Sequence, residues 1–233
     1  MRLLISAAAA FAAMAMIAAC DSAKSLAARA GLGGFEARCE ASLPATRIEV
    51  VTAPVVYGTD RNRSWRELTV MSGDATPTLR ALGLTTAQVG HQASVETTGI
   101  EDQRNGRVCV RPSIRVEVSA TPMTVYIGQE IAGDPCRDAV ALEHELKHVA
   151  VYTEELAKIA DDVRALLAAS YGNRVLYYGS RAEAQRETQA ALGAELGPLL
   201  AGNVRRIKER QRTIDSPEEY ARVSAACGGM MKD

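Results

Sequence analysis

Apolar and polar residues alternate with a period of two through much of the first half of the chain. The apolar positions are rich in Val, Ile and Thr, and Gly, Pro or Asp separates one run from the next, which is typical of β-strands. On this pattern we expect strands in the ranges 46–58, 65–73, 91–99, 107–120 and 123–131. Residues 78–90 predict a short helix between two of these strands.

The pattern changes at Asp134-Pro135, which has the residue types of a helix N-cap followed by proline at the first helical position. No glycine or proline follows until Gly172. Apolar residues between these points recur at steps of three and four, namely Val149, Tyr152, Leu156, Ile159, Val163 and Leu166. This period predicts one long amphipathic helix that ends at Gly172-Asn173.

Further helices are expected after this one. Ser180 and Glu183 have the spacing of a capping box, and Gly197-Pro198 predicts a kink in the helix that they open. Ser216-Pro217 predicts the start of a last short helix that ends at Gly228-Gly229. A strand-rich half that is followed by a helical half predicts an α+β fold.

The composition narrows the class of protein. Leu, Val, Ile and Ala are ample for one core, although aromatic residues are only 4% of the chain. The formal net charge is −1 and there is no basic block, which argues against nucleic acid as a partner.

The N-terminal sequence predicts that the protein is located in the cell envelope. Residues 1–19 have a charged start, an apolar run and small residues before a cleavage site, as in a secretory signal peptide. Ile17-Ala18-Ala19-Cys20 resembles the lipobox of bacterial lipoproteins, which implies that Cys20 becomes the lipidated first residue. Residues 20–38 are then a tether, and residues 39–233 form one domain. We expect this domain to be lipid-anchored in a bacterial envelope and to face the periplasm or the exterior.

The remaining cysteines predict disulfides. They are Cys39, Cys109, Cys136 and Cys227. In an oxidising compartment they predict two bridges, for which three pairings exist. We favour Cys39–Cys109 and Cys136–Cys227, because each bridge then stays within one half of the chain. No C-x-x-C pair is present, so a thiolate zinc site is not expected.

The long predicted helix carries His144-Glu145-Leu146-Lys147-His148, an H-E-x-x-H motif that holds two of the three histidines in the chain. Residues four apart on a helix share a face, so His144 and His148 can bind one metal ion. Glu145 projects beside them and can act as the general base. The alternative is a polar surface helix that matches the motif by chance, but Tyr152 and Leu156 continue the His148 side and make that side apolar.

Zinc needs a third protein ligand. The metzincin pattern is not met, because Val151 stands in place of its glycine and Glu154 in place of its last histidine. Thermolysin-like enzymes supply a glutamate from a later helix, followed four residues on by an aspartate. Glu183 and Glu187 have that spacing, so Glu183 is the expected ligand and Glu187 the acceptor of a hydrogen bond from a ligand imidazole.

The third-ligand prediction has alternatives. Glu183 is also the capping-box partner of Ser180, and Glu187 is the next choice as a ligand. Glu154 and Glu155 are poorer choices, because an unbroken helix carries them past the motif. His91 is more typical of an ordinary strand residue.

Substrate binding suggests two further hypotheses. The strand 123–131 just before the motif helix is either a sheet edge that pairs with a peptide or an ordinary core strand. Tyr177 and Tyr178 either stabilise an oxyanion or pack.

The order of these features resembles the bacterial family of predicted secreted zinc-dependent proteases, with His144, Glu145 and His148 as the specific shared residues. The resemblance implies a zincin-like fold, in which the strand-rich half packs on the motif helix, and one Zn²⁺ per chain. It also implies a metallopeptidase that acts on envelope proteins or peptides. A zinc amidase on cell-wall peptides and a non-catalytic envelope lipoprotein are the alternatives, and Glu145 argues against the second because a structural site needs no base.

Overall fold

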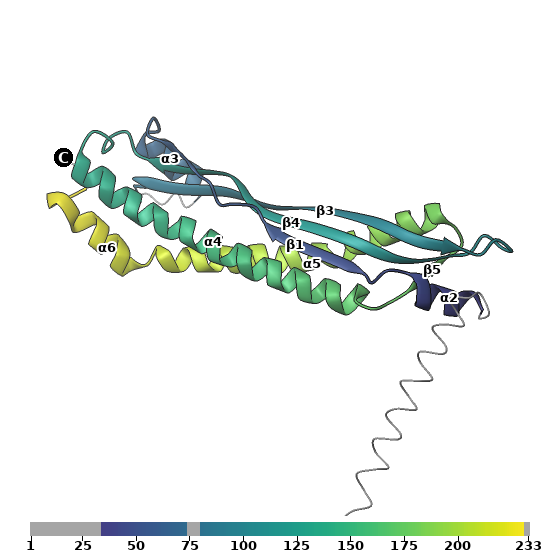
Figure 1. Ribbon diagram of the computed structural model, residues 1–233. Coiled ribbons are helices and arrows are strands. Elements are labelled where there is room, and N and C mark those ends of the chain that lie inside the picture. The colour runs from purple at the N-terminus through teal and green to yellow at the C-terminus, as the bar shows by residue number, and fades with distance from the viewer. Residues whose placement is uncertain (1–33, 74–79, 231–233) are drawn as a thin grey trace, which may run out of the picture. The chain divides into compact units, whose positions relative to one another are not determined.

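The computed structural model describes residues 34–73 and 80–230 (Figure 1). The predicted signal peptide (1–19) and lipidation site Cys20 lie outside these residues. Within them, one five-stranded sheet is combined with several helices, which confirms the predicted α+β class. None of the helices in the described ranges has an apolar stretch of the length needed to cross a bilayer.

Most of the strand residues precede α4, and the long helices α4 and α5 come after β4. In chain order they are α2 (Phe35–Ser42), β1 (Arg47–Thr52), β2 (Gly58–Asp60), α3 (Trp65–Ser72), β3 (Gly83–Glu101), β4 (Val108–Ile127), α4 (Pro135–Tyr171), β5 (Leu176–Tyr178), α5 (Arg181–Ile214), α6 (Pro217–Ala225) and a 3-10 helix (Ala226–Gly228).

β4 is the central strand, because each of the other four strands pairs with it. β2 runs parallel to β4, with Gly58 opposite Thr124 and Asp60 opposite Tyr126. β5 runs antiparallel to it, with Val108 opposite Tyr178. The strand expected at 123–131 forms the end of β4, which pairs with both β2 and β3, so it is not a sheet edge. Among the described residues, β3 pairs with β4 alone.

β4 is one strand where the sequence predicted two. Buried residues occupy even positions from Val110 to Ala120 and odd positions from Met123 to Ile127. The change from even to odd buried positions occurs at the exposed pair Thr121-Pro122, and the strand continues through it. The expected break at this pair was wrong, because pairing with neighbouring strands continues across it.

Two predicted elements were exchanged in type. Residues 65–73 were expected to be a strand but form α3, with a capping box between Ser64 and Glu67 and Gly73 at its C-terminal cap with φ 76°. Residues 78–90 were expected to be a short helix, yet those from Gly83 onward belong to β3. The local capping signals were stronger than the alternation in the first case, and pairing with β4 overrides helix propensity in the second.

The predicted helices after residue 134 are confirmed. The carboxylate of Asp134 accepts hydrogen bonds from the backbone N–H groups of Cys136 and Arg137, and α4 then continues for 37 residues to Tyr171. α5 runs through Pro198 as one helix. Ser216 caps α6, whose first residue is a proline.

Two compact units make up the described chain. The first contains residues up to Ile48, Ser94–Ile114 and Leu167–Leu192, and the second contains Glu49–Ala93, Arg115–Leu166 and the residues from Gly193 onward. In the first unit, buried Phe35 and Cys39 of α2 pack with Cys109 of β4. The Cys39–Cys109 disulfide is present, as predicted. Because helical structure begins at Phe35, the expected tether 20–38 was too long by its last residues.

The second unit contains the H-E-x-x-H motif. Its core draws on alternate residues of β4 and on one side of α4, including Val116, Val118, Val125, Leu156, Ile159 and Val163. α4 and the second half of α5 lie side by side (Figure 1), joined by ion pairs from Arg206 and Arg210 to Glu155. The Cys136–Cys227 disulfide is also present as predicted, and it ties the chain after α6 to the start of α4.

Candidate metal centre

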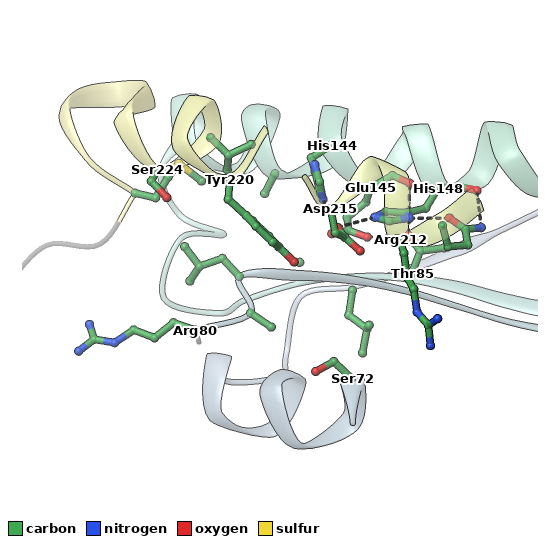
Figure 2. Close-up of a pocket in the computed structure, with 18 of the residues that line it drawn as sticks. Ser72, Arg80, Thr85, His144, Glu145, His148, Arg212, Asp215, Tyr220 and Ser224 are labelled. Carbon is green, nitrogen blue, oxygen red and sulfur yellow. Dashed lines mark hydrogen bonds and ion pairs between the residues drawn. The ribbon is translucent and has the colours of Figure 1, made fainter. Parts of the chain in front are cut away.

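A cavity of about 920 Å³ lies within the second unit, lined by residues of α4, α5, α6 and the start of β3. His144, Glu145 and His148 reach it from α4, Asp215 from the turn after α5, and Tyr220 from α6 (Figure 2). The H-E-x-x-H motif thus lines the wall of a substantial cavity.

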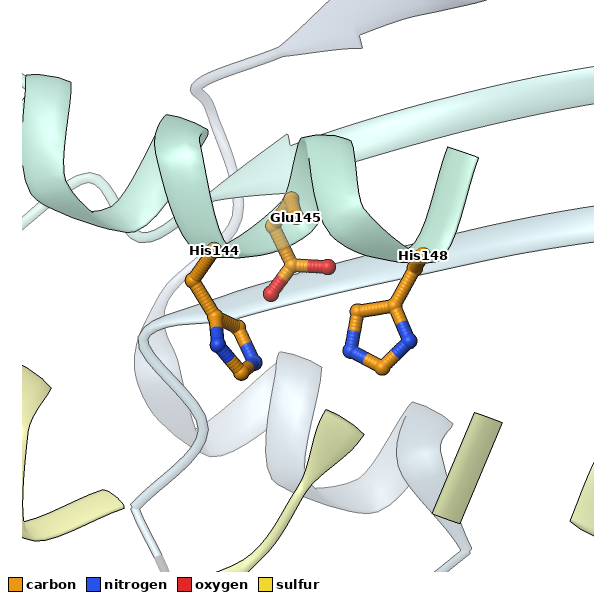
Figure 3. A group of neighbouring side chains, drawn as sticks. All are labelled: His144, Glu145 and His148. Atoms are coloured by element: carbon orange, nitrogen blue, oxygen red, sulfur yellow. The ribbon is translucent and has the colours of Figure 1, made fainter. Parts of the chain in front are cut away.

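The three motif side chains project together from α4 (Figure 3). One ligand atom from each lies within 4.8 Å of the others, so the group could hold a metal ion. His144 and His148 are each only 8% exposed and Glu145 is 3% exposed. Such polar groups are rarely buried without a partner or an ion, which makes the surroundings of each ring nitrogen informative.

One ring nitrogen of each histidine is held by a side chain from later in the chain. Nδ1 of His144 lies 3.1 Å from Oε1 of Glu219, and Nδ1 of His148 lies 2.6 Å from Oε1 of Gln211. The Gln211 amide also donates to the backbone carbonyl of His148 at 3.2 Å. Carboxylate and amide oxygens only accept, so each Nδ1 carries a proton. In a neutral ring the other nitrogen, Nε2, is then a bare acceptor.

Both Nε2 atoms face the same carboxylate. Oδ1 of Asp215 lies 3.2 Å from Nε2 of His144 and 3.2 Å from Nε2 of His148. Three acceptor atoms at these distances repel one another unless a cation lies among them, either a proton on an imidazole or a metal ion. Two imidazoles and one carboxylate, with the outer nitrogens of the imidazoles hydrogen-bonded, are side chains that could hold a metal ion.

The ionisation of these groups follows from burial and from their contacts. Burial lowers the pKa of His144 and of His148, but hydrogen bonds to Asp215 and to Glu219 or Gln211, together with the nearby charge of Glu145, outweigh it, so both pKa values are raised. Burial opposes ionisation of Asp215 as well, yet the two imidazoles hold the pKa of that carboxyl well below its usual range. The cluster therefore favours an anionic carboxylate with positive charge beside it.

Glu145 has a separate setting on the β3 side of the motif. Oγ1 of Thr85 donates to Oε2 of Glu145 at 2.8 Å. Burial is the main cause that raises the pKa of Glu145. β3 approaches closely because residue 83 is glycine, since a Cβ there would lie 2.9 Å from Cδ of Glu145. This carboxylate faces the cavity with one oxygen held and no basic side chain bonded to it among the described residues.

The segment from α5 to α6 is fixed by several contacts. Glu219 accepts from Nζ of Lys147 at 2.6 Å and from Nε of Arg222 at 2.8 Å, and these hydrogen bonds lower its pKa. Beyond α6, Cys227 is bonded to Cys136, and Nε of Arg137 donates to the carbonyl of Gly229 at 2.8 Å. The residues that contact both histidines therefore lie on a segment anchored to α4 at its far end.

The predicted third ligand is not part of this group. Glu183 lies in the first unit, and its Oε2 accepts from the backbone N–H of Gly179 at 2.8 Å. Its own N–H donates to Oγ of Ser180 at 3.2 Å, so Glu183 serves the helix start. Glu187, also in the first unit, is exposed and lies near Arg186. Asp215 takes the place beside the histidines that the sequence analysis gave to Glu183.

The other candidates are also elsewhere. Glu154 pairs with Arg210, and Glu155 is held by three basic side chains of α4 and α5. His91 is an exposed residue of β3. The hydroxyl of Tyr178 lies 3.0 Å from Oγ1 of Thr188, and Tyr177 packs edge-on to Phe35, both within the first unit. The described tyrosines that line the cavity are instead Tyr152 and Tyr220.

Sequence reasoning missed Asp215, Glu219, Gln211 and Thr85. The position of Asp215 just before the Ser216-Pro217 helix start carries no metal-binding signal, because an acidic residue beside a helix start is common.

Comparison with family models, with curated proteins and with solved structures gives no match for this chain.

Proposed function

We propose that this chain is a zinc-dependent peptidase of the bacterial cell envelope, with His144, His148 and Asp215 as metal ligands and Glu145 as general base. The single observation that carries the proposal is the position of Asp215, whose Oδ1 lies 3.2 Å from Nε2 of both motif histidines. Three protein ligands beside a cavity would suit a catalytic zinc site, whereas structural sites fill all four positions with protein groups.

The residues around the cavity would have different roles in the reaction. A bound zinc ion would supply Lewis acidity, which lowers the pKa of water and polarises a carbonyl group. Glu219 and Gln211 accept hydrogen bonds from Nδ1 of His144 and His148, and they would thereby orient each Nε2 toward a bound ion. Glu145 would accept a proton from water at the carboxyl oxygen that Thr85 leaves open, and then give it to the leaving amine.

The start of β3 is the segment where we propose that an extended peptide binds beside these groups. Leu82, Gly83, Leu84 and Thr85 line the cavity at the start of β3. Since β3 pairs with β4 alone among the described residues, its other edge offers backbone hydrogen bonds to a peptide strand. This edge replaces the strand 123–131 that the sequence analysis considered for the same role.

The test separates metal binding from catalysis in the purified soluble domain. Glu145→Gln should keep about one zinc per chain and lose cleavage of a peptide library by at least about a hundredfold, because the base is removed while the ligands remain. Asp215→Asn should lose zinc, measured by mass spectrometry. Glu183→Gln is the matched control, and it should keep both zinc and activity.

Two results would contradict the proposal in different ways. If the wild-type protein contains no zinc after purification and dialysis against zinc, the proposed metal site is wrong. If Asp215→Asn retains zinc but Glu183→Gln loses it, the third ligand is Glu183 and not Asp215.

A further inference from the structure

Two pairs of basic residues with four-residue spacing lie near the end of α5. Arg206 and Arg210 face α4, where Nε of Arg206 lies 2.6 Å and Nη1 of Arg210 lies 2.7 Å from the carboxylate of Glu155. Lys208 and Arg212 are offset from them by two residues and line the cavity. Side chains two residues apart on a helix do not share a face, so the two pairs serve different surfaces.

The cavity-facing pair has no acidic partner. Among the described residues, neither Lys208 nor Arg212 forms an ion pair or a side-chain hydrogen bond, and both are exposed. In Figure 2 the guanidinium of Arg212 points away from His148 and Asp215, and no dashed line joins it to another residue. By contrast, Arg206, Arg210 and Arg222 nearby are all paired.

The acidic groups of the cavity cannot serve as these partners. Asp215 is engaged by both histidines, and Glu145 is buried and bonded to Thr85. The rim near the end of α5 is therefore positively charged. A metal ion at the histidines would add to this charge.

Apolar side chains make up much of the remaining lining. They are Leu82, Leu84, Tyr152, Ile207, Val223 and Met230. A cavity of about 920 Å³ with this lining is large enough for several residues of a peptide. The combination selects a ligand that is largely apolar and carries a carboxylate.

We propose that Lys208 and Arg212 determine substrate specificity by binding a carboxylate of the peptide, so that the cavity prefers apolar peptides with an acidic side chain or a free C-terminus. This inference rests on the proposed peptidase function for its biological meaning, but the binding preference can be measured without cleavage. Arg212 suits a carboxylate because its guanidinium can donate two parallel hydrogen bonds.

The experiment measures binding to zinc-free protein by fluorescence anisotropy of dansyl-labelled peptides. Three probes share one length: Ala-Leu-Glu-Leu-Ala with an amidated end, Ala-Leu-Gln-Leu-Ala with an amidated end, and Ala-Leu-Gln-Leu-Ala with a free carboxylate. The wild type should bind at least one of the two acidic probes about tenfold more tightly than the neutral one, and which one it prefers identifies the source of the carboxylate.

Variants test whether Lys208 and Arg212 cause the preference for acidic probes. Arg212→Gln and Lys208→Gln should bind all three probes with similar affinity, while Arg205→Gln, which removes a cation of the same helix outside this cavity, should keep the wild-type preference. Equal binding of the three probes by the wild type, no binding of any probe, or an equal effect of Arg205→Gln would overturn the inference. A retained preference in a protein that cleaves no peptide would refute only the peptidase proposal.

Discussion

Replacing Glu155 by glutamine tests how α5 is held against the motif helix. The carboxylate of Glu155 is fully buried and accepts hydrogen bonds from Arg206 at 2.6 Å, Arg210 at 2.7 Å and Lys158 at 2.9 Å. Arg210 precedes Gln211, whose side chain contacts His148. Glu155→Gln keeps the shape of the side chain but removes the charge that these three cations share.

The size of the effect follows from the pKa. Burial alone would raise the pKa of Glu155, but hydrogen bonds from Arg206, Arg210 and Lys158 lower it from 4.5 to about 2. At about 1.36 kcal/mol per pH unit, that fall corresponds to about 3.4 kcal/mol as an upper limit. The three cations are partly exposed, with 35–55% of their side chains accessible, so water screens them. We expect Glu155→Gln to lower the free energy of unfolding by about 2 kcal/mol at pH 7.

The pH dependence has a defined sign. Because the pKa of Glu155 is lower in the folded state, its stabilisation is fully present above about pH 4.5 and is lost as the pH falls towards about 2. Urea unfolding of wild type and variant between pH 7 and pH 2 should show the difference in stability shrinking over that window.

The control for this experiment is Glu154→Gln. Glu154 is more than half exposed, and Arg210 is its one ion-pair partner within the described part of the chain, so its loss should cost less than about 1 kcal/mol. A Glu155→Gln effect no larger than that of Glu154→Gln, or one that does not change with pH, would refute the reasoning.

Three further predictions concern other parts of the chain. Gly83→Ala should cost about 1–3 kcal/mol in thermal or urea unfolding, because its Cβ would overlap the Glu145 carboxyl, whereas Gly90→Ala, which meets open space, should cost less than about 1 kcal/mol. Cys227→Ser should cost about 2–5 kcal/mol and also reduce zinc content, since it frees the segment that contacts the motif histidines; unchanged zinc content would contradict this link. Cys20→Ser should abolish labelling by a fatty-acid probe in cells, and equal labelling of wild type and variant would end the lipoprotein prediction.

The sequence alone predicted the features that depend on near neighbours. The start of α4 at Asp134-Pro135, its length and the shared face of His144 and His148 all follow from capping and from the 3.6-residue period. The two disulfides were also predicted, because four cysteines allow few pairings and one bridge could be assigned to each half.

Local signals failed where two of them conflicted. Residues 65–73 alternate like a strand but carry a capping box and a C-terminal glycine, and the helix α3 forms. Residues 83–90 have no such caps, and hydrogen bonding to β4 makes them part of a strand. The outcome in each case depends on hydrogen bonds that alternation alone does not reveal.

Only the tertiary structure decided what surrounds the motif. Asp215 is 71 residues from His144, and its position depends on the length of α5, on the turn before α6 and on the disulfide that anchors the following segment. Glu183 matched a spacing rule better, yet its carboxylate bonds to the backbone at its own helix start. A spacing rule works within one helix because the backbone geometry is regular, whereas contacts between helices are set by packing of side chains that are distant in sequence.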